Sequence, residues 1–230
     1  MRFSSILGGL LLGAAAAAQA TPVSLSKLTS LIGGSPANTA VYKADLSSLS
    51  LASILSITIT DNSFGGGGSA GQFSGFDLDA IMLSTTDCAD ASCIASATAL
   101  SVFNFTSGTT FTPGVQRAPA DPKLFGTDAS GTAVDNSVAS LGDFDANSTT
   151  AIPGAFGFLS MGDGGVINFD LTSAVSTAGL FLYIGEVGDN GEVAASDIQV
   201  RDTHRVPEPG SLALLGLALM SAWAARRRRD

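Results

Sequence analysis

Eight short runs of apolar or alternating residues recur along the middle of the chain, and no sustained helical period lies between them. Clusters of Gly, Asn, Asp or Pro separate most of the runs, which is typical of strands joined by turns. Two runs, ITIT and VINFDL, alternate apolar and polar residues, as strands with one solvent-exposed face do. The runs are VYKADL from Val41, ILSITIT from Ile54, FDLDAIML from Phe76, TALSVFNF from Thr98, GAFGFLSM from Gly154, GVINFDLT from Gly165, LFLYIGEV from Leu180 and ASDIQV from Ala195. They predict an all-β domain, an antiparallel two-layer β-sandwich of jelly-roll-like type.

The N-terminus is typical of a signal peptide. Arg2 is the only charge before an apolar run from Ile6 to Ala18, and Ala18-Gln19-Ala20 has the small-x-small pattern that signal peptidase cleaves. We therefore expect residues 1–20 to be a signal helix that is removed, which leaves Thr21 as the mature N-terminus of an exported protein.

The C-terminal segment 211–225 carries no charge, and four arginines, Arg226, Arg227, Arg228 and Arg229, follow it directly. Its length of about 22 Å suits either a buried core helix or a short transmembrane helix. Four adjacent cations cannot enter a core, but they suit the cytoplasmic end of a membrane helix. The sequence therefore predicts a transmembrane helix at 211–225 and a cytoplasmic basic tail at 226–230.

Pro207, Glu208 and Pro209 precede that segment. Two prolines resist helix formation and hold the tripeptide extended, where a protease can reach it. This order of motif, apolar segment and arginine cluster resembles the PEP-CTERM sorting signal of Gram-negative bacteria that make exopolysaccharide. The resemblance implies that an exosortase, a membrane cysteine transpeptidase, recognises the three residues and removes the helix. A permanent anchor preceded by a helix stop is the alternative.

These assignments divide the chain into a signal peptide (1–20), a β-sandwich ectodomain (21–202), a linker with the PEP motif (203–210), the membrane helix and the basic tail. They predict a precursor anchored in the inner membrane by its C-terminal helix, followed by delivery to the cell surface or extracellular matrix.

Residues 21–209 are strongly acidic. Without Arg2 and the four tail arginines, six of the 11 basic residues remain, and without Asp230, 19 of the 20 acidic residues remain, so the net charge is near −13. Such a surface repels nucleic acid, which we exclude as a partner, and attracts divalent cations.

Cys88 and Cys93 are the only cysteines. An even count in an oxidising compartment favours a disulfide that holds a short turn, whereas zinc binding would need two further ligands.

Three groups of residues offer the oxygen ligands that calcium takes: Asp77 with Asp79, Asp143 with Asp145, and Asp189 and Asn190 beside Glu186 and Glu192. Solvated acids in turns are the alternative for each group. The run from Asp143 departs from an EF-hand because Ser148 and Gly154 stand where that loop needs Gly and Glu.

The sequence offers few residues that could act as catalytic groups. His204, the single histidine, lies in the predicted linker, and Glu186 with Asp170 or Asp189 is the least unsuitable carboxylate pair for glycoside cleavage. The mature body has no Trp and only Tyr42 and Tyr183 for stacking on a sugar ring, so sugar binding cannot rest on aromatic residues.

The stretches GFLSMGDGGVINFDL and LFLYIGEVGDNGE are similar to sandwich ectodomains found ahead of this sorting signal, and they imply a fold without an activity. We therefore expect a non-catalytic exported protein without a firm cofactor, processed by signal peptidase and exosortase and associated with exopolysaccharide or biofilm. The alternatives are a calcium-assisted polysaccharide-binding module and a secreted hydrolase.

Overall fold

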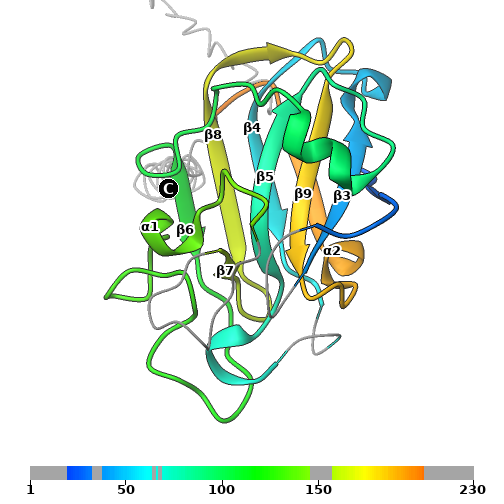
Figure 1. Cartoon of the computed structure of the whole chain (residues 1–230). Coiled ribbons are helices and arrows are strands. Elements are labelled where there is room, and N and C mark those ends of the chain that lie inside the picture. Colours follow the sequence, from blue (N-terminus) through cyan, green and yellow to red (C-terminus); the bar gives the residue numbers. More distant parts are fainter. Residues whose placement is uncertain (1–19, 33–37, 64–65, 67–68, 146–156, 205–230) are drawn as a thin grey trace, which may run out of the picture.

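The computed structural model describes residues 20–32, 38–63, 66, 69–145 and 157–204. Two antiparallel five-stranded sheets pack face to face as a sandwich (Figure 1). Sheet A has the order β1-β10-β4-β8-β6, and sheet B has the order β2-β3-β9-β5-β7. The predicted antiparallel two-layer sandwich is therefore confirmed, whereas its finer assignment as jelly-roll-like stays a prediction.

Sheet A is built around β4 (Ser53–Thr60) and β8 (Val166–Ser176), which pair from Thr60↔Val166 to Ser53↔Ser176. Its other strands are β10 (Asp197–Arg201), β6 (Thr109–Thr112) and β1 (Thr21–Pro22).

Sheet B is built around β9 (Phe181–Val187), which lies between β3 (Thr39–Asp45) and β5 (Asp77–Ser84). Short strands β2 (Ser26–Lys27) and β7 (Leu159–Ser160) form its edges. The pairing of β5 with β9 shifts by one residue between Leu78 and Ile81, which is a β-bulge.

The core lies between the two sheets, where alternate residues of facing strands are fully buried. Ile57 and Ile59 of β4 and Leu182 and Ile184 of β9 belong to this cluster. The alternation that predicted strands in the sequence therefore corresponds to the face that each strand buries.

Helical segments are short and lie in the connections. They are the 3₁₀ turns η1 (Leu46–Ser48), η2 (Gly71–Phe73) and η3 (Ala91–Ser96), and the α-helices α1 (Asn136–Ala139) and α2 (Glu192–Ala195). None of these described helices is long and apolar enough to cross a membrane. The predicted signal helix and transmembrane helix fall outside the described residues.

The strand predicted over residues 98–105 was wrong. The side-chain oxygen of Asn104 accepts hydrogen bonds from the backbone N–H groups of Thr106 and Ser107, at 3.0 and 3.1 Å, which turns the chain. Sheet pairing resumes only at β6, four residues later than the predicted run ends. Phe103 and Phe105 still pack against the core, so their apolar character reflects burial without a strand.

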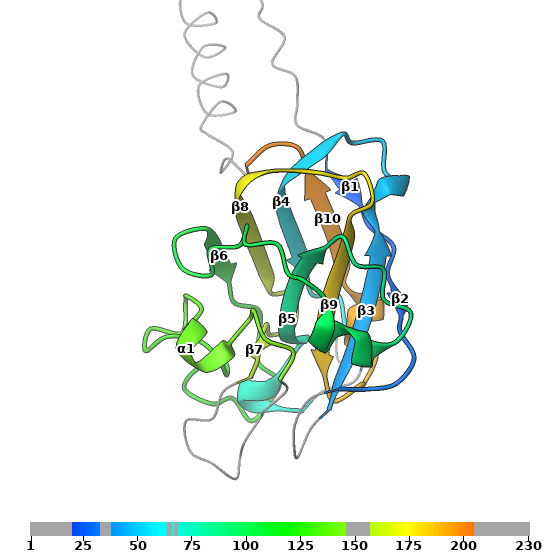
Figure 2. The same cartoon turned by 45° about the horizontal axis from the view of Figure 1, so that its top comes forward.

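The two ends of the described chain lie together on sheet A. β1 pairs with β10 with Thr21 opposite Val200, and Figure 2 shows the two strands side by side. The backbone O of Thr203 accepts a hydrogen bond from the Ser56 hydroxyl at 2.8 Å, which fixes the chain just beyond β10. Thr21, the predicted mature N-terminus, and the last described residues therefore lie beside the same strand pair.

Candidate functional site

The two acids of β5 are buried and each has a hydroxyl partner. Asp77 accepts a hydrogen bond from Ser160 of β7, and the Asp79 carboxylate accepts one from the Thr39 hydroxyl of β3 at 2.6 Å. Burial raises the pKa of Asp77 well above its usual range, and the Ser160 hydrogen bond opposes part of that rise. Both acids thus serve contacts between strands of sheet B.

Gly185 of β9 makes the Thr39–Asp79 contact possible. β9 lies between β3 and β5, so these side chains meet across it at a position without a side chain. A Cβ at Gly185 would lie 2.9 Å from Thr39 Cγ2 and 3.1 Å from Asp79 Cβ. The glycine is therefore needed for close approach, which is a usual reason for glycine inside a strand.

Glu186 follows on β9 and is fully buried. Its Oε1 atom accepts a hydrogen bond from the backbone N–H of Glu192 at 2.6 Å, which ties α2 to the sheet. Burial raises the pKa of Glu186, and the hydrogen bond from Glu192 partly offsets that effect. The Tyr42 hydroxyl, on the neighbouring strand, also has a raised pKa because of burial and the nearby Glu186 charge.

Arg117, in the connection between β6 and α1, binds the turn before β8. Its Nε lies 3.0 and 3.1 Å from the two carboxylate oxygens of Asp163, and its Nη2 lies 2.6 Å from one of them. The same Nη2 lies 3.8 Å from Oε1 of Glu192, too far for a hydrogen bond. Asp163 bonding and the charges of Glu192 and Asp61 raise the pKa of Arg117.

Asp143 and Asp145 lie on another connection, whereas Asp189 lies in the turn between Glu186 and Glu192. Asp143 is exposed after α1, Asp145 accepts a hydrogen bond from Ser140, and Asp189 forms an ion pair with Lys27. Over the described part of the chain, no group of three or more His, Cys, Asp or Glu side chains is arranged to hold a metal ion. The predicted calcium residues therefore form no such site there.

The two predicted carboxylate pairs are placed differently. Asp189 lies in the turn after β9, near enough for its charge to raise the pKa of Glu186, and it pairs with Lys27. Asp170 lies on β8 of sheet A, whereas Glu186 lies on β9 of sheet B. His204 lies beyond β10, with its Nδ1 atom 3.8 Å from an Asp170 carboxylate oxygen, and its side chain is half exposed.

Cys88 and Cys93 form the predicted disulfide. Cys88 is fully buried and its backbone N–H donates to the Tyr183 hydroxyl at 2.9 Å, while that hydroxyl donates to the backbone O of Thr86 at 2.7 Å. The disulfide and the tyrosine together fix the loop of η3 on sheet B.

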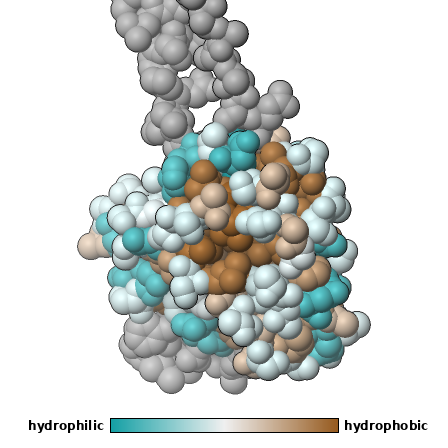
Figure 3. All heavy atoms as spheres, turned by 90° about the horizontal axis from the view of Figure 1, so that it is seen from above, coloured by the Kyte–Doolittle hydropathy of each residue, from teal (hydrophilic) through white to brown (hydrophobic). Residues whose placement is uncertain are grey.

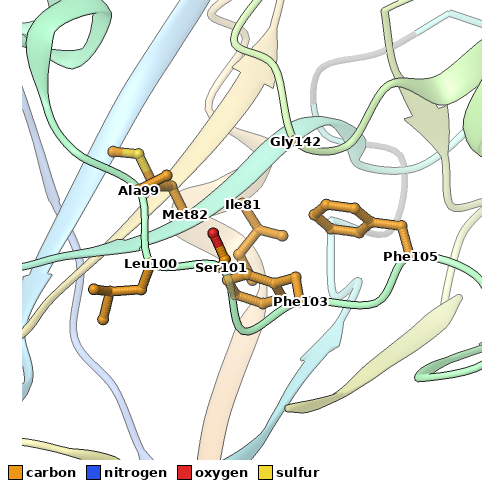
Figure 4. Close-up of a pocket in the computed structure, with 8 residues that line it drawn as sticks. All are labelled: Ile81, Met82, Ala99, Leu100, Ser101, Phe103, Phe105 and Gly142. Carbon is orange, nitrogen blue, oxygen red and sulfur yellow. The ribbon is translucent and has the colours of Figure 1, made fainter. Parts of the chain in front are cut away.

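An apolar pocket of about 270 Å³ lies beside β5. The rings of Phe103 and Phe105 are nearly parallel, with centroids 5.5 Å apart, and line it together with Ile81 and Met82 (Figure 4). Ser101 supplies the one side-chain hydroxyl of the lining, which contains no charged residue. Seen from above, the molecule shows apolar residues in the middle of its face, with polar residues among and around them (Figure 3). This pocket can hold an apolar group, but it offers no acid or base.

Sequence reasoning missed Arg117 and this pocket. It grouped Glu192 with Glu186, Asp189 and Asn190 as oxygen ligands for calcium, but not as a buried carboxylate. Arg117 stands in a stretch that reads as a surface excursion, and its partner Asp163 lies 46 residues away. The one sequence signal was the scarcity of basic residues in an acidic body, which makes any arginine a candidate for pairing with several acids.

The predicted sorting residues Pro207, Glu208 and Pro209 and the arginines Arg226–Arg229 lie outside the described residues, which end at His204. Comparison of the sequence with known proteins bears on this segment. No curated protein and no solved structure matches the chain significantly. Residues 205–229 match the family model described as the PEP-CTERM protein-sorting motif. The chain thus carries at its C-terminus the PEP-CTERM sorting motif, which implies an exported protein, made as a membrane-anchored precursor and processed by an exosortase.

Proposed function

We propose that this chain is a non-catalytic exported protein of the cell surface or extracellular matrix, delivered there by exosortase processing and associated with exopolysaccharide. The observation that carries the proposal is the sorting motif at 205–229, which begins directly after the described β-sandwich. An independently packed body joined to a removable anchor is what delivery to the surface requires.

The chemistry of the body supports a non-catalytic role. Glu186 and Asp77 are buried and engaged in contacts that hold strands or α2 in place. A glycosidase needs two carboxylates that face a common cleft about 5 to 10 Å apart. Glu186 and Asp170 belong to different sheets, and the pocket beside β5 contains neither of them.

Association with exopolysaccharide rests on the kind of bacterium in which this sorting signal is used. The body's net charge near −13 favours a neutral or cation-bridged polymer over a bare polyanion. The calcium-assisted alternative has no supporting arrangement among the described residues.

Substitution of Glu208 tests the proposal. Glu208→Ala should leave membrane insertion intact, because the apolar segment is unchanged, while it blocks processing. The uncut form should accumulate in the membrane fraction, as wild-type protein should in a strain without exosortase. Asp202→Asn removes a nearby exposed acid outside the motif and is the matched control, which should be processed normally. Release of Glu208→Ala at the wild-type rate would contradict the proposal.

A further inference from the structure

Glu192, the first residue of α2, carries a carboxylate in the interior of the sandwich. Its side chain has no exposed surface, and neither carboxylate oxygen has a hydrogen-bond partner of ordinary geometry. Oε2 of Glu186, its neighbour, is likewise buried without a partner. A buried ionised carboxylate without hydrogen bonds is strongly unfavourable, so these atoms need a physical explanation.

The groups around Glu192 do not neutralise it. Glu186 on β9 and Asp77 on β5 are both acidic. The Asn190 amide and the Asp77 backbone N–H face Glu192, and the Tyr42 hydroxyl faces Glu186; they favour the ionised carboxylates but carry no charge. Asp189 in the turn before α2 pairs with Lys27 of β2.

Arg117 is the one cation near this group within the described residues, and other acids share it. It is bonded to Asp163 through three contacts, and Asp61 also lies close enough to raise its pKa. One arginine therefore faces several carboxylates, and its nearest approach to Glu192 is 3.8 Å. Among the described residues, no group of three or more His, Cys, Asp or Glu side chains is arranged to hold a metal ion. A proton is the remaining way to remove the charge.

We propose that Glu192 is a proton-controlled latch: neutral Glu192 holds α2 and the turn from Gly188 against sheet B, and ionised Glu192 leaves the interior, opening residues 188–196 while both sheets stay folded. This inference does not depend on the proposed function.

The local backbone suits such a movement. The turn contains three residues with positive φ, Gly188, Asp189 and Gly191, and α2 has only four residues. The contact of this segment with β9 includes the Glu192 N–H to Glu186 bond. Val193 is buried in the core and opposes opening, so the segment stays closed while Glu192 is neutral.

The pH range follows from the burial of Glu192. Removal from water raises its pKa from 4.5 to about 7 in the closed form, and the Glu186 charge adds to the rise, while Asn190 and Arg117 oppose it. A carboxyl with a raised pKa stabilises the closed form fully below its pKa in the open form, and this contribution is lost as the pH rises through about 7. The latch should therefore be closed in mildly acidic medium and loosened in mildly alkaline medium.

Hydrogen exchange followed by mass spectrometry tests the latch on the exported full chain in detergent micelles. After correction for intrinsic exchange rates, the opening constant of residues 188–196 should rise at least about tenfold from pH 5.5 to pH 8. The opening constant changes between pH 4.5 and about 7, and this range overlaps the measured interval from pH 5.5 to about 7. Peptides from β4 and β8 should change little and are the internal reference.

Glu192→Gln keeps the shape of the side chain and removes its titration, so the protection of residues 188–196 should become independent of pH. The control variant Asp202→Asn should keep the wild-type response. The proposal would be overturned if the opening constant of residues 188–196 did not rise in the wild type, or if it rose equally in Glu192→Gln. Restoration of protection at pH 8 by calcium but not by magnesium would also overturn it, because a cation would then neutralise the cluster.

Discussion

Replacement of Arg117 by alanine should destabilise the folded body more than an ordinary surface substitution. The change removes three contacts with Asp163 and the charge nearest to Glu192. Loss of one partner of a buried ion pair costs about 3 to 5 kcal/mol, whereas exposed pairs contribute under about 1 kcal/mol. The Arg117 and Asp163 side chains are 17% and 22% exposed, which places this pair nearer to the buried limit. We therefore expect the free energy of unfolding to fall by about 2 to 3 kcal/mol.

Urea denaturation at pH 7.5 measures this loss, and thermal denaturation should show a Tm lower by roughly 6 °C, because about 2 to 4 °C corresponds to 1 kcal/mol in a domain of this size. Arg117→Lys is the matched variant. It keeps the charge but cannot reproduce the planar contacts with Asp163, so it should recover part of the stability. The loss in Arg117→Ala should be smaller at pH 5.5, where Glu192 is protonated. A loss below about 0.5 kcal/mol at pH 7.5, the size of an ordinary surface substitution, would refute the reasoning.

Two further predictions concern sheet B. Gly185→Ala should lower the free energy of unfolding by about 1 to 3 kcal/mol in urea denaturation, because its Cβ would press on Thr39 and Asp79; unchanged stability would show that these side chains move aside freely. Reduction of the Cys88–Cys93 disulfide should lower the Tm without unfolding the body, since the closed loop is short and would contribute about 2 kcal/mol. Loss of the native circular dichroism spectrum on reduction at 25 °C would contradict this estimate.

The strands that form the centres of both sheets could be predicted from the sequence. β4 and β8 alternate apolar and polar residues, and the cores of β3, β5, β9 and β10 fall within the predicted runs. Burial of one face imposes a period of two on the residues of a strand, so the alternation of apolar and polar residues predicts the strand and its buried face.

The edges could not be predicted in this way. β1, β2 and β7 have two residues each, too few for a period, and their pairing depends on the position of a neighbouring strand. The run at 98–105 has the composition of a strand, but the Asn104 turn interrupts it.

Among the candidate sites too, those formed by neighbouring residues could be predicted from the sequence, and those assembled by the fold could not. Local spacing predicted the Cys88–Cys93 disulfide and the sorting motif, because both lie within a few consecutive residues. Glu186 and Glu192 are close in the sequence and could be grouped from it, whereas Asp77 on β5 and Arg117 come near Glu192 only in the fold. The sequence placed Asp77 and Asp79 correctly on a strand but offered no sign that they would be buried.

The C-terminus of the protein recovered from the cell surface tests the central claim most directly. Mass spectrometry of this material should give a chain that starts at Thr21 and lacks residues 211–225, and it should give this product only in cells that contain an exosortase. The same cells without exosortase should yield a form that retains those residues in the membrane fraction. Recovery from the surface of a chain that still carries residues 211–225, in equal amounts with and without exosortase, would contradict the account.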